Sequence, residues 1–189
     1  MTHSSTINWG VNAGYHDAAI SVVKNDTIVF AGHAERYSRI KNDKLLNSGL
    51  IQDALKWGEP DNIYWFENPV WKATRRIFAG QNKWWTNPKD YFTMVGYEPP
   101  CKIKWGSHHK SHMAAGYYTS PFKECATLVI DAIGEWTTIS IWKNEKLVWD
   151  CSYPQSLGLF YSAMTDRVGL KPNEDEYILM GMSAYGDPH

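Results

Sequence analysis

NAGYHDAAISVVKNDTIVF, residues 12–30, aligns without a gap with DAIGEWTTISIWKNEKLVW, residues 131–149, when the sequence is shifted by 119 positions. Each copy follows an apolar strand and contains a hairpin whose turn is Lys-Asn-Asp or Lys-Asn-Glu. Such turns are common between β-branched strands, so two unrelated hairpins can converge on this pattern. A gapless match over both strands and the preceding turn favours an internal duplication.

The segments that follow each copy alternate between helical and strand-like patterns. Helices are predicted at residues 50–58 and 68–80, with strands at 62–67 and 101–106. After the second copy, residues 156–170 have helical spacing and end near a glycine. Together these elements predict a two-lobed α/β fold. In such a fold ligands bind between the lobes, where the first turn of each lobe is found.

Composition excludes several classes of protein. The chain has 189 residues, 43% of them hydrophobic, which is enough for a sizeable core. A formal net charge of -1 provides no basic field for general binding of nucleic acid or an anionic membrane. The N-terminus has no signal-peptide pattern and no later run reaches the length of a membrane span, so a soluble cytoplasmic protein is expected.

Two residue types are unusual in number or spacing. Cys101, Cys125 and Cys151 are odd in number and widely spaced, so they are expected to be reduced and structural. The aromatic segment with Trp84, Trp85 and Tyr91 either lines a binding cleft or belongs to the core or a partner interface.

Three histidines lie close together in KWGSHHKSHMAAGYY, residues 104–118. If the segment is helical, His108 and His112 stand at i and i+4 on one face, whereas His109 points about 100° away. The alternative is a polar first turn with Ser107 as N-cap. Two ligands do not make a metal site. The duplication supplies a third, because Asp131 ends the strand of the second copy and would face the histidine helix across the cleft.

Six ordered blocks carry a family resemblance. The chain resembles the N-terminal part of the O-carbamoyltransferases that modify antibiotics and nodulation factors, which are relatives of the tRNA threonylcarbamoyl-adenosine enzymes. The blocks are GYHDAAISVV, AERYSRIKND, HHKSHMAAGYYTSPF, LVIDAIGEW, SLGLFYSAMTDRVGL and LMGMSAYG. The resemblance implies a duplicated-lobe fold of the sugar-kinase, actin and heat-shock-protein type. Residues 1–122 would form the first lobe, with the His16 turn and the HHxxH helix, and residues 123–189 the beginning of an incomplete second lobe.

The resemblance also implies a reaction and its residues. The family moves a carbamoyl group from carbamoyl adenylate, which a separate domain makes from carbamoyl phosphate and ATP, to an acceptor hydroxyl. His16 would be the general base, because a neutral imidazole suits that role near pH 7. By resemblance His108, His112 and Asp131 would hold a divalent metal, expected to be Fe²⁺, with zinc and manganese left open.

Other residues receive weaker assignments. Lys41 would face the cleft and bind a phosphate or carbamoyl oxygen, although an ordinary solvated lysine in the charged run RIKNDK is the alternative. Gly134 and Glu135, in the turn of the second copy, are expected to bind the nucleotide. Asp17 is expected to cap a turn rather than to orient its sequence neighbour His16.

Two departures from the family pattern limit the expected activity. Relatives commonly have Lys where Ile178 stands in EYILMG, which removes a cation from an expected phosphate contact. The chain ends at AYGDPH, where the family continues, so it is expected to be inactive without a C-terminal portion supplied in cis or in trans. The alternatives are a threonylcarbamoyl-type tRNA modification enzyme, whose histidine motif is usually one residue longer, and a non-catalytic metal-binding scaffold. A sugar, an antibiotic-like molecule and a modified nucleotide all stay open as acceptor.

Overall fold

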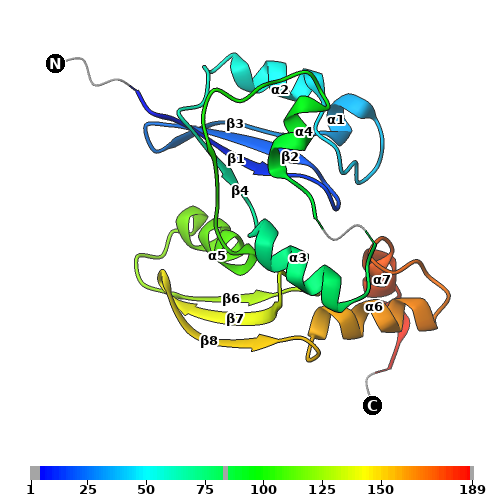
Figure 1. Ribbon diagram of the computed structural model, residues 1–189. Coiled ribbons are helices and arrows are strands. Elements are labelled where there is room, and N and C mark those ends of the chain that lie inside the picture. The colour runs from blue at the N-terminus through cyan, green and yellow to red at the C-terminus, as the bar shows by residue number, and fades with distance from the viewer. Residues whose placement is uncertain (1–4, 83–84, 188–189) are drawn as a thin grey trace. The chain divides into compact units, whose positions relative to one another are not determined.

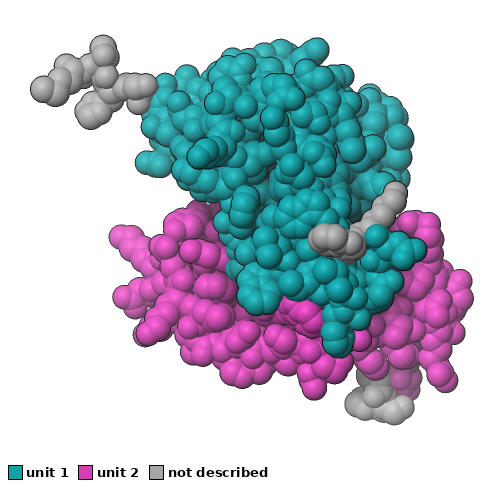
Figure 2. Space-filling model, viewed as in Figure 1, with its two compact units in different colours: residues 1–108 teal, residues 109–189 magenta. Residues whose placement is uncertain are grey.

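The computed structural model describes residues 5–82 and 85–187, which belong to two compact units, residues 1–108 and residues 109–189. Figure 1 shows the elements of each unit along the chain, and Figure 2 colours the first unit teal and the second magenta. Each unit contains its own β-sheet, of five strands in the first and three in the second.

The first unit contains a mixed sheet with the strand order β3-β2-β1-β4-β5. The first three strands form an antiparallel meander, β4 pairs parallel with β1, and β5 pairs parallel with β4. Alternation of buried and half-buried residues along β1 and β2 places one face of the sheet in the core. The strands are β1 Ile7–Asn12, β2 Ala19–Lys24, β3 Thr27–His33, β4 Asn62–Trp65 and β5 Ile103–Trp105.

Asparagine is the N-cap residue of three helices in this unit. The side chains of Asn47, Asn68 and Asn87 each accept a backbone N–H from the first turn of the helix that follows, and two of these helices start with proline. The helices predicted near residues 50–58 and 68–80 are thereby confirmed. The helices are α1 Glu35–Ser38, α2 Ser48–Leu55, α3 Pro69–Phe78 and α4 Pro88–Thr93.

The core of the first unit lies on one face of its sheet. Trp9, Val11 and Val22 are at most 3% exposed and cluster with Leu50 of α2 and Phe92 of α4. Tyr91 packs against this core, with its ring stacked 5.4 Å from the Trp65 ring. This confirms the core interpretation for Tyr91, whereas Trp85 is 48% exposed. Trp84, from the same aromatic segment, lies outside the described residues.

The second unit has an antiparallel sheet with the order β6-β7-β8. Helix α5 packs on one face of this sheet, where Met113 clusters with Val129 and Trp142. Helix α6 ends just before Gly169, whose φ of 81° lies in the left-handed region that favours glycine, as predicted. The elements are α5 His108–Thr119, β6 Ala126–Ile130, β7 Thr137–Lys143, β8 Lys146–Ser152, α6 Leu157–Arg167, α7 Glu176–Met182 and a 3₁₀ turn Ser183–Tyr185.

The duplication predicted from the sequence is visible in the strand registers. Ile7 pairs with Lys24 in the first sheet, and Ala126 pairs with Lys143, each 119 positions later, in the second. The hairpin register shifts at Val22/Val23 and again at the equivalent pair Ile141/Trp142. The turn residues Asn25 and Asn144 both have left-handed backbones. Equivalent register, bulge and turn confirm the α/β fold with duplicated lobes.

Other expectations are met or stay open. The three cysteines are free, as predicted. No helix in the described part of the chain has both the length and the apolar character needed to cross a membrane. The compact units divide after His108, the first residue of α5, whereas the lobe boundary was predicted after residue 122. That boundary stays a prediction, because a division by packing does not define the evolutionary repeat.

Candidate functional site

His16 lies in the turn between β1 and β2 and contacts its neighbour. Asp17 has a left-handed backbone with φ 50°, and its Oδ2 lies 2.8 Å from His16 Nδ1. The expectation that Asp17 does not orient His16 was therefore wrong. Neighbouring side chains diverge in an extended strand, but the left-handed turn brings these two together. When the proton of the neutral imidazole is on Nδ1, Nδ1 donates to Asp17 and Nε2 is the ring nitrogen that can accept a further proton.

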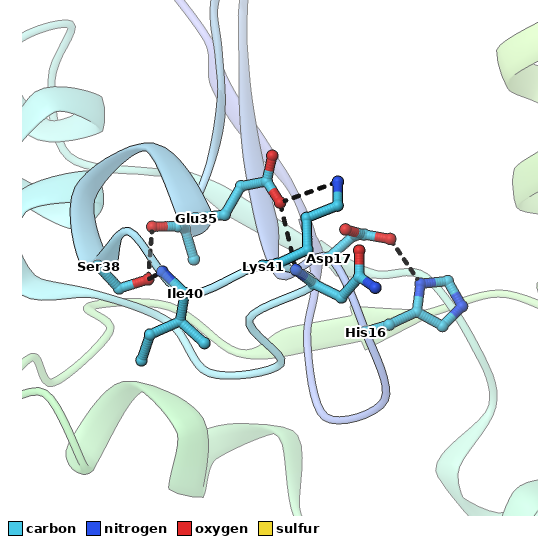
Figure 3. Close-up of polar contacts among 8 residues, drawn as sticks. His16, Asp17, Glu35, Ser38, Ile40 and Lys41 are labelled. Carbon is cyan, nitrogen blue, oxygen red and sulfur yellow. Dashed lines mark hydrogen bonds and ion pairs between the residues drawn. The ribbon is translucent and has the colours of Figure 1, made fainter. Parts of the chain in front are cut away.

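The loop that carries Lys41 is bound to the His16 turn by backbone hydrogen bonds. The Gly14 N–H donates to the Lys44 carbonyl at 2.8 Å, and the Ala18 N–H donates to the Asp43 carbonyl at 2.7 Å. The two donors, Gly14 and Ala18, lie on either side of His16 in the sequence, and the two acceptors follow Lys41. Residues 13–18 and 39–44 therefore form one local structure, part of which Figure 3 shows.

The side chain of Glu35, at the start of α1, contacts the loop that carries Lys41. Its Oε2 accepts the Asn42 N–H at 3.2 Å and lies 3.7 Å from Lys41 Nζ (Figure 3). The Glu35 side chain is 17% exposed, whereas that of Lys41 is 80% exposed. Sequence reasoning missed Glu35, although the charged stretch AERYSRIKND contains it together with both partners.

An open depression of about 410 Å³ adjoins these groups. Asp17 and Lys41 both line it, so the partner of His16 and the candidate lysine share one surface. Most of its lining residues are of polar or charged types, and the full set is Asp17, Ala31, Gly32, His33, Glu35, Arg36, Lys41 and Asn42.

A second group of functional side chains gathers around the start of α5 and the end of β6. His108, His112 and Asp131 each place a ligand atom so that all three atoms lie within 4.8 Å of one another. The histidines are one turn apart on α5, as their spacing predicted. His108 and Asp131 are half-buried and His112 is exposed, so the group is accessible from solvent.

His109 does not join this group and has a structural role. It is 3% exposed, and its Nδ1 lies 2.8 Å from Ser140 Oγ on β7. Trp142 Nε1 donates to the same hydroxyl oxygen at 2.8 Å. His109 therefore anchors α5 to the sheet, while His108 and His112 project along another direction.

The turn that follows β6 holds Asp131 in place. Asp131 Oδ1 accepts the Ala132 N–H at 2.7 Å, and the Asp131 N–H donates to the Thr138 carbonyl at 2.9 Å. The predicted nucleotide-binding residues Gly134 and Glu135 belong to this turn and are buried. Their predicted role is not tested by these contacts and stays a prediction.

The donor set fits a divalent transition metal. Two imidazoles and a carboxylate are typical ligands of Fe²⁺, Zn²⁺ and Mn²⁺, and three protein ligands leave coordination positions for other groups. The proximity of three such atoms, brought together from a helix and a strand end, is the observation on which this fit rests.

Comparison with known proteins identifies the family. The chain belongs to the family described as carbamoyltransferase N-terminus, whose model matches residues 93–189. The matched region contains the histidine helix, Asp131 and the turn with Gly134 and Glu135. The resemblance seen in the sequence is thereby confirmed.

The chain is also similar to several longer proteins. It is 34% identical to protein sll1178 of Synechocystis, with 95% of this chain and 34% of that protein aligned. It is 26% identical to the nodulation protein NolNO of Sinorhizobium fredii, with 94% of this chain and 29% of that protein aligned. The chain thus spans about a third of the length of these curated relatives.

Solved structures with low identity are similar over nearly the whole chain. A Ppx/GppA family member from Aquifex aeolicus has 12% identity and a TM-score of 0.42, with 98% of this chain and 64% of that chain covered. The Lmo2764 protein from Listeria monocytogenes has 10% identity and a TM-score of 0.40, with 97% and 72% covered.

Proposed function

We propose that this chain is the N-terminal portion of an O-carbamoyltransferase that moves a carbamoyl group from carbamoyl adenylate to an acceptor hydroxyl. The observation that carries the proposal is the gathering of His108, His112 and Asp131 within a region that matches the carbamoyltransferase family. The chain supplies a base and metal ligands, and the remaining portion of the enzyme acts with it in cis or in trans.

His16 acts as the general base in this proposal. An alcohol has a pKa far above 7, so its attack on the carbamoyl carbon needs a group that removes the proton. Asp17 holds Nδ1, which leaves Nε2 to accept the hydroxyl proton, and its carboxylate stabilises the imidazolium that results. The 2.8 Å contact between these neighbours supports this role more directly than the sequence did.

Lys41 provides a positive charge beside the same turn. Its ammonium group acts as a point charge toward a phosphate or carbamoyl oxygen. The hydrogen bonds from Gly14 and Ala18 to the lysine loop, and the contacts of Glu35 with that loop, keep Lys41 on the surface that Asp17 lines.

His108, His112 and Asp131 would hold the metal, which is Fe²⁺ by resemblance to the family. A divalent metal bound there supplies Lewis-acid stabilisation of negative charge on the departing adenylate phosphate. Gly134 and Glu135 would contact the nucleotide from the adjacent turn.

Metal analysis tests the ligand set. The purified chain, equilibrated with Fe²⁺ without oxygen or with Zn²⁺, is expected to retain metal after gel filtration. His112→Ala should weaken binding by at least about tenfold, since even the loss of a group that supports a ligand costs that much. Lys110→Ala, on the same helix, is the matched control and should bind as wild type does. Equal metal content in His112→Ala and wild type would show that the ligands are misassigned.

A transfer assay tests the base. The chain is combined with the remaining portion of a full-length relative, and carbamoyl adenylate is supplied with a panel of hydroxyl acceptors. His16→Asn keeps a similar size and hydrogen bonding but cannot take up the proton, so the rate should fall by about 10²–10⁴. Metal content should stay unchanged.

Three outcomes would change the proposal. Transfer by His16→Asn at the wild-type rate would remove His16 as the base. Loss of metal together with activity would place His16 among the ligands. Absence of transfer by the wild type with every acceptor would favour the non-catalytic scaffold.

A further inference from the structure

Helix α3 carries three cations, and a carboxylate pairs with only one of them. Lys72, Arg75 and Arg76 all belong to this helix. The ammonium group of Lys72 is buried and pairs with the buried carboxylate of Glu67. The guanidinium group of Arg76 donates from Nη1 to the neutral hydroxyl of Thr86 at 3.4 Å. Among residues 5–82 and 85–187, neither arginine side chain has an ion pair of its own, so positive charge is in excess on this helix.

Arg75 is the least satisfied of these cations. Its side chain is half-buried, and its Nε is shielded from solvent without a hydrogen-bond partner among the described residues. Burial, followed by the charge of Arg76, lowers the pKa of the Arg75 guanidinium below its ordinary value. A buried donor without an acceptor and two adjacent like charges both cost free energy of folding. Costs of this kind are expected at functional sites, where a ligand supplies the missing contacts.

Arg75 lies near the turn that carries His16. Its charge interacts with the phenol of Tyr15, which precedes His16 in the chain. The Tyr15 ring lies 4.9 Å from the His16 ring, centroid to centroid, and Tyr15 is 57% exposed. A solvent-accessible tyrosine thus contacts the proposed base and lies within electrostatic reach of Arg75.

Arg76 is connected to the same turn through Tyr91. The two side chains interact electrostatically, and Thr86 interacts with both of them. The Tyr91 hydroxyl lies directly against Gly14, because a Cβ added to Gly14 would overlap it. Both arginines therefore approach the His16 turn, and all of these residues belong to the first compact unit.

Guanidinium groups in this setting are receptors for oxyanions. Their planar N–H donors match the oxygens of a carboxylate or a phosphate, so binding is often bidentate. Partial burial reduces the screening of the charge by salt. The formal charge of the whole chain is -1, so the attraction is local and depends on α3.

The position of the base decides which reactant these arginines meet. A general base must lie within hydrogen-bond reach of the hydroxyl whose proton it takes. Groups beside the His16 turn therefore contact the acceptor that supplies this hydroxyl.

We propose that the acceptor is a hydroxyl compound that also carries an oxyanion, a phosphate or a carboxylate, and that Arg75 binds this oxyanion beside the His16 turn. Arg76 adds a second positive charge at the same place. The inference rests on the proposed function, because it takes His16 as the base, and it narrows the acceptor to anionic hydroxyl compounds. Inorganic phosphate and the phosphate of the donor share this chemistry, so the experiment includes both as separate ligands.

Nuclear magnetic resonance of the purified, nitrogen-labelled chain tests the binding without any transfer reaction. Glucose phosphate and gluconate represent anionic acceptors, glucose is the neutral control, and inorganic phosphate and AMP represent the other sources of an oxyanion. At constant ionic strength, glucose phosphate and gluconate should shift the Nε–H resonance of Arg75 in a saturable manner, whereas glucose should not. They should also shift the backbone amides of Tyr15 and His16, which inorganic phosphate should leave nearly unchanged.

Substitutions at Arg75 separate a binding role from a structural one. Arg75→Gln should weaken binding of glucose phosphate by at least about tenfold, because charge-assisted hydrogen bonds are lost. Arg75→Lys keeps the charge without the planar donors and should bind with intermediate affinity. Arg167→Gln removes the same charge from the last turn of α6, where the side chain is exposed, and should bind as wild type does. Without an anion, Arg75→Gln should unfold at no lower a temperature than wild type, since it removes an unbalanced charge.

The transfer assay with the complemented enzyme tests the acceptor itself. Glucose phosphate should be a better acceptor than glucose. Arg75→Gln should raise the KM for glucose phosphate by at least about tenfold and leave the KM for glucose unchanged, because only the anionic acceptor uses the guanidinium group.

Several results would overturn the proposal. Absence of a saturable shift at Arg75 with every anion, or a clear fall in the unfolding temperature of Arg75→Gln, would remove the site. Tighter binding of AMP than of glucose phosphate would assign the arginines to the donor. Equal transfer to glucose and glucose phosphate would contradict an anionic acceptor. Binding at Arg75 with no transfer by the wild type to any acceptor would refute the proposed function and the acceptor assignment, while the oxyanion site would stand on the resonance data.

Discussion

Glu35 joins two residues that the sequence places six and seven positions later. Its carboxylate accepts the backbone N–H of Asn42 and lies near the ammonium group of Lys41. Asn42 has a left-handed backbone with φ 54°, so the loop turns sharply at the residue that Glu35 binds. A half-buried carboxylate thus determines where an otherwise exposed lysine loop lies.

Exchange of the Asn42 amide measures this contact directly. Glu35→Ala removes the acceptor, and exchange at Asn42 should become about 10- to 100-fold faster, since hydrogen bonds to charged groups contribute roughly 1.5–3 kcal/mol. Glu35→Gln keeps an acceptor oxygen and should show a smaller change. Glu98→Ala removes an exposed carboxylate that pairs with Lys89 in the same unit, and it should have no effect at Asn42. Unchanged exchange in Glu35→Ala would mean that the loop is held by its backbone bonds alone.

At the scale of elements, the start of α6 packs directly on the turn that carries Asp131. Ser156 caps the helix by accepting the Leu159 N–H at 3.0 Å, and its hydroxyl donates to the Ala132 carbonyl at 2.5 Å. Gly158 allows this approach, because a Cβ at that position would lie 2.5 Å from the Ala132 nitrogen. The position of a proposed metal ligand therefore depends on a glycine in a different element.

Gly158→Ala is expected to destabilise the chain and to disturb the metal group. The added methyl group meets backbone rather than a flexible side chain, so unfolding should be easier by about 1–3 kcal/mol. Metal binding should weaken as well, because the Asp131 turn must move. Gly181→Ala in α7 is the control, since nothing lies within 4 Å of its added carbon, and alanine in a helix gains up to about 1 kcal/mol. Urea unfolding of the two variants with equal midpoints would refute the close packing at Gly158.

At the scale of the whole molecule, each compact unit contains one copy of the duplicated hairpin. The family resemblance assigns formation of carbamoyl adenylate to a separate domain, and the described residues form the two units only. The chain supplied as the single protein is therefore expected not to make carbamoyl adenylate from carbamoyl phosphate and ATP. Release of pyrophosphate, compared with a blank without protein, measures this reaction. Pyrophosphate formed together with the adenylate would contradict the assignment of each unit to a lobe.

Much of the fold could be predicted from local sequence patterns. The Lys-Asn turns, the alternation of apolar residues and the gapless repeat predicted both hairpins, because turn geometry and a period of two are encoded by neighbouring residues. The i and i+4 spacing of His108 and His112 likewise follows from helix geometry alone. In contrast, α1 and α4 are too short for a helical period to be recognised, and they were not predicted.

Unusual backbone conformations, loop paths and the packing of elements on one another could be learned only from the folded chain. The pairing of His16 with Asp17 depends on the left-handed backbone of Asp17, which no local sequence pattern predicted. Glu35 was not predicted because the path of the loop determines which residues it contacts. The packing of α5 on the second sheet, through His109 and Ser140, places the histidines beside Asp131. Residue spacing specifies which side chains share a face of one element, but the distance between two elements depends on how their buried surfaces pack, which is a property of the folded chain.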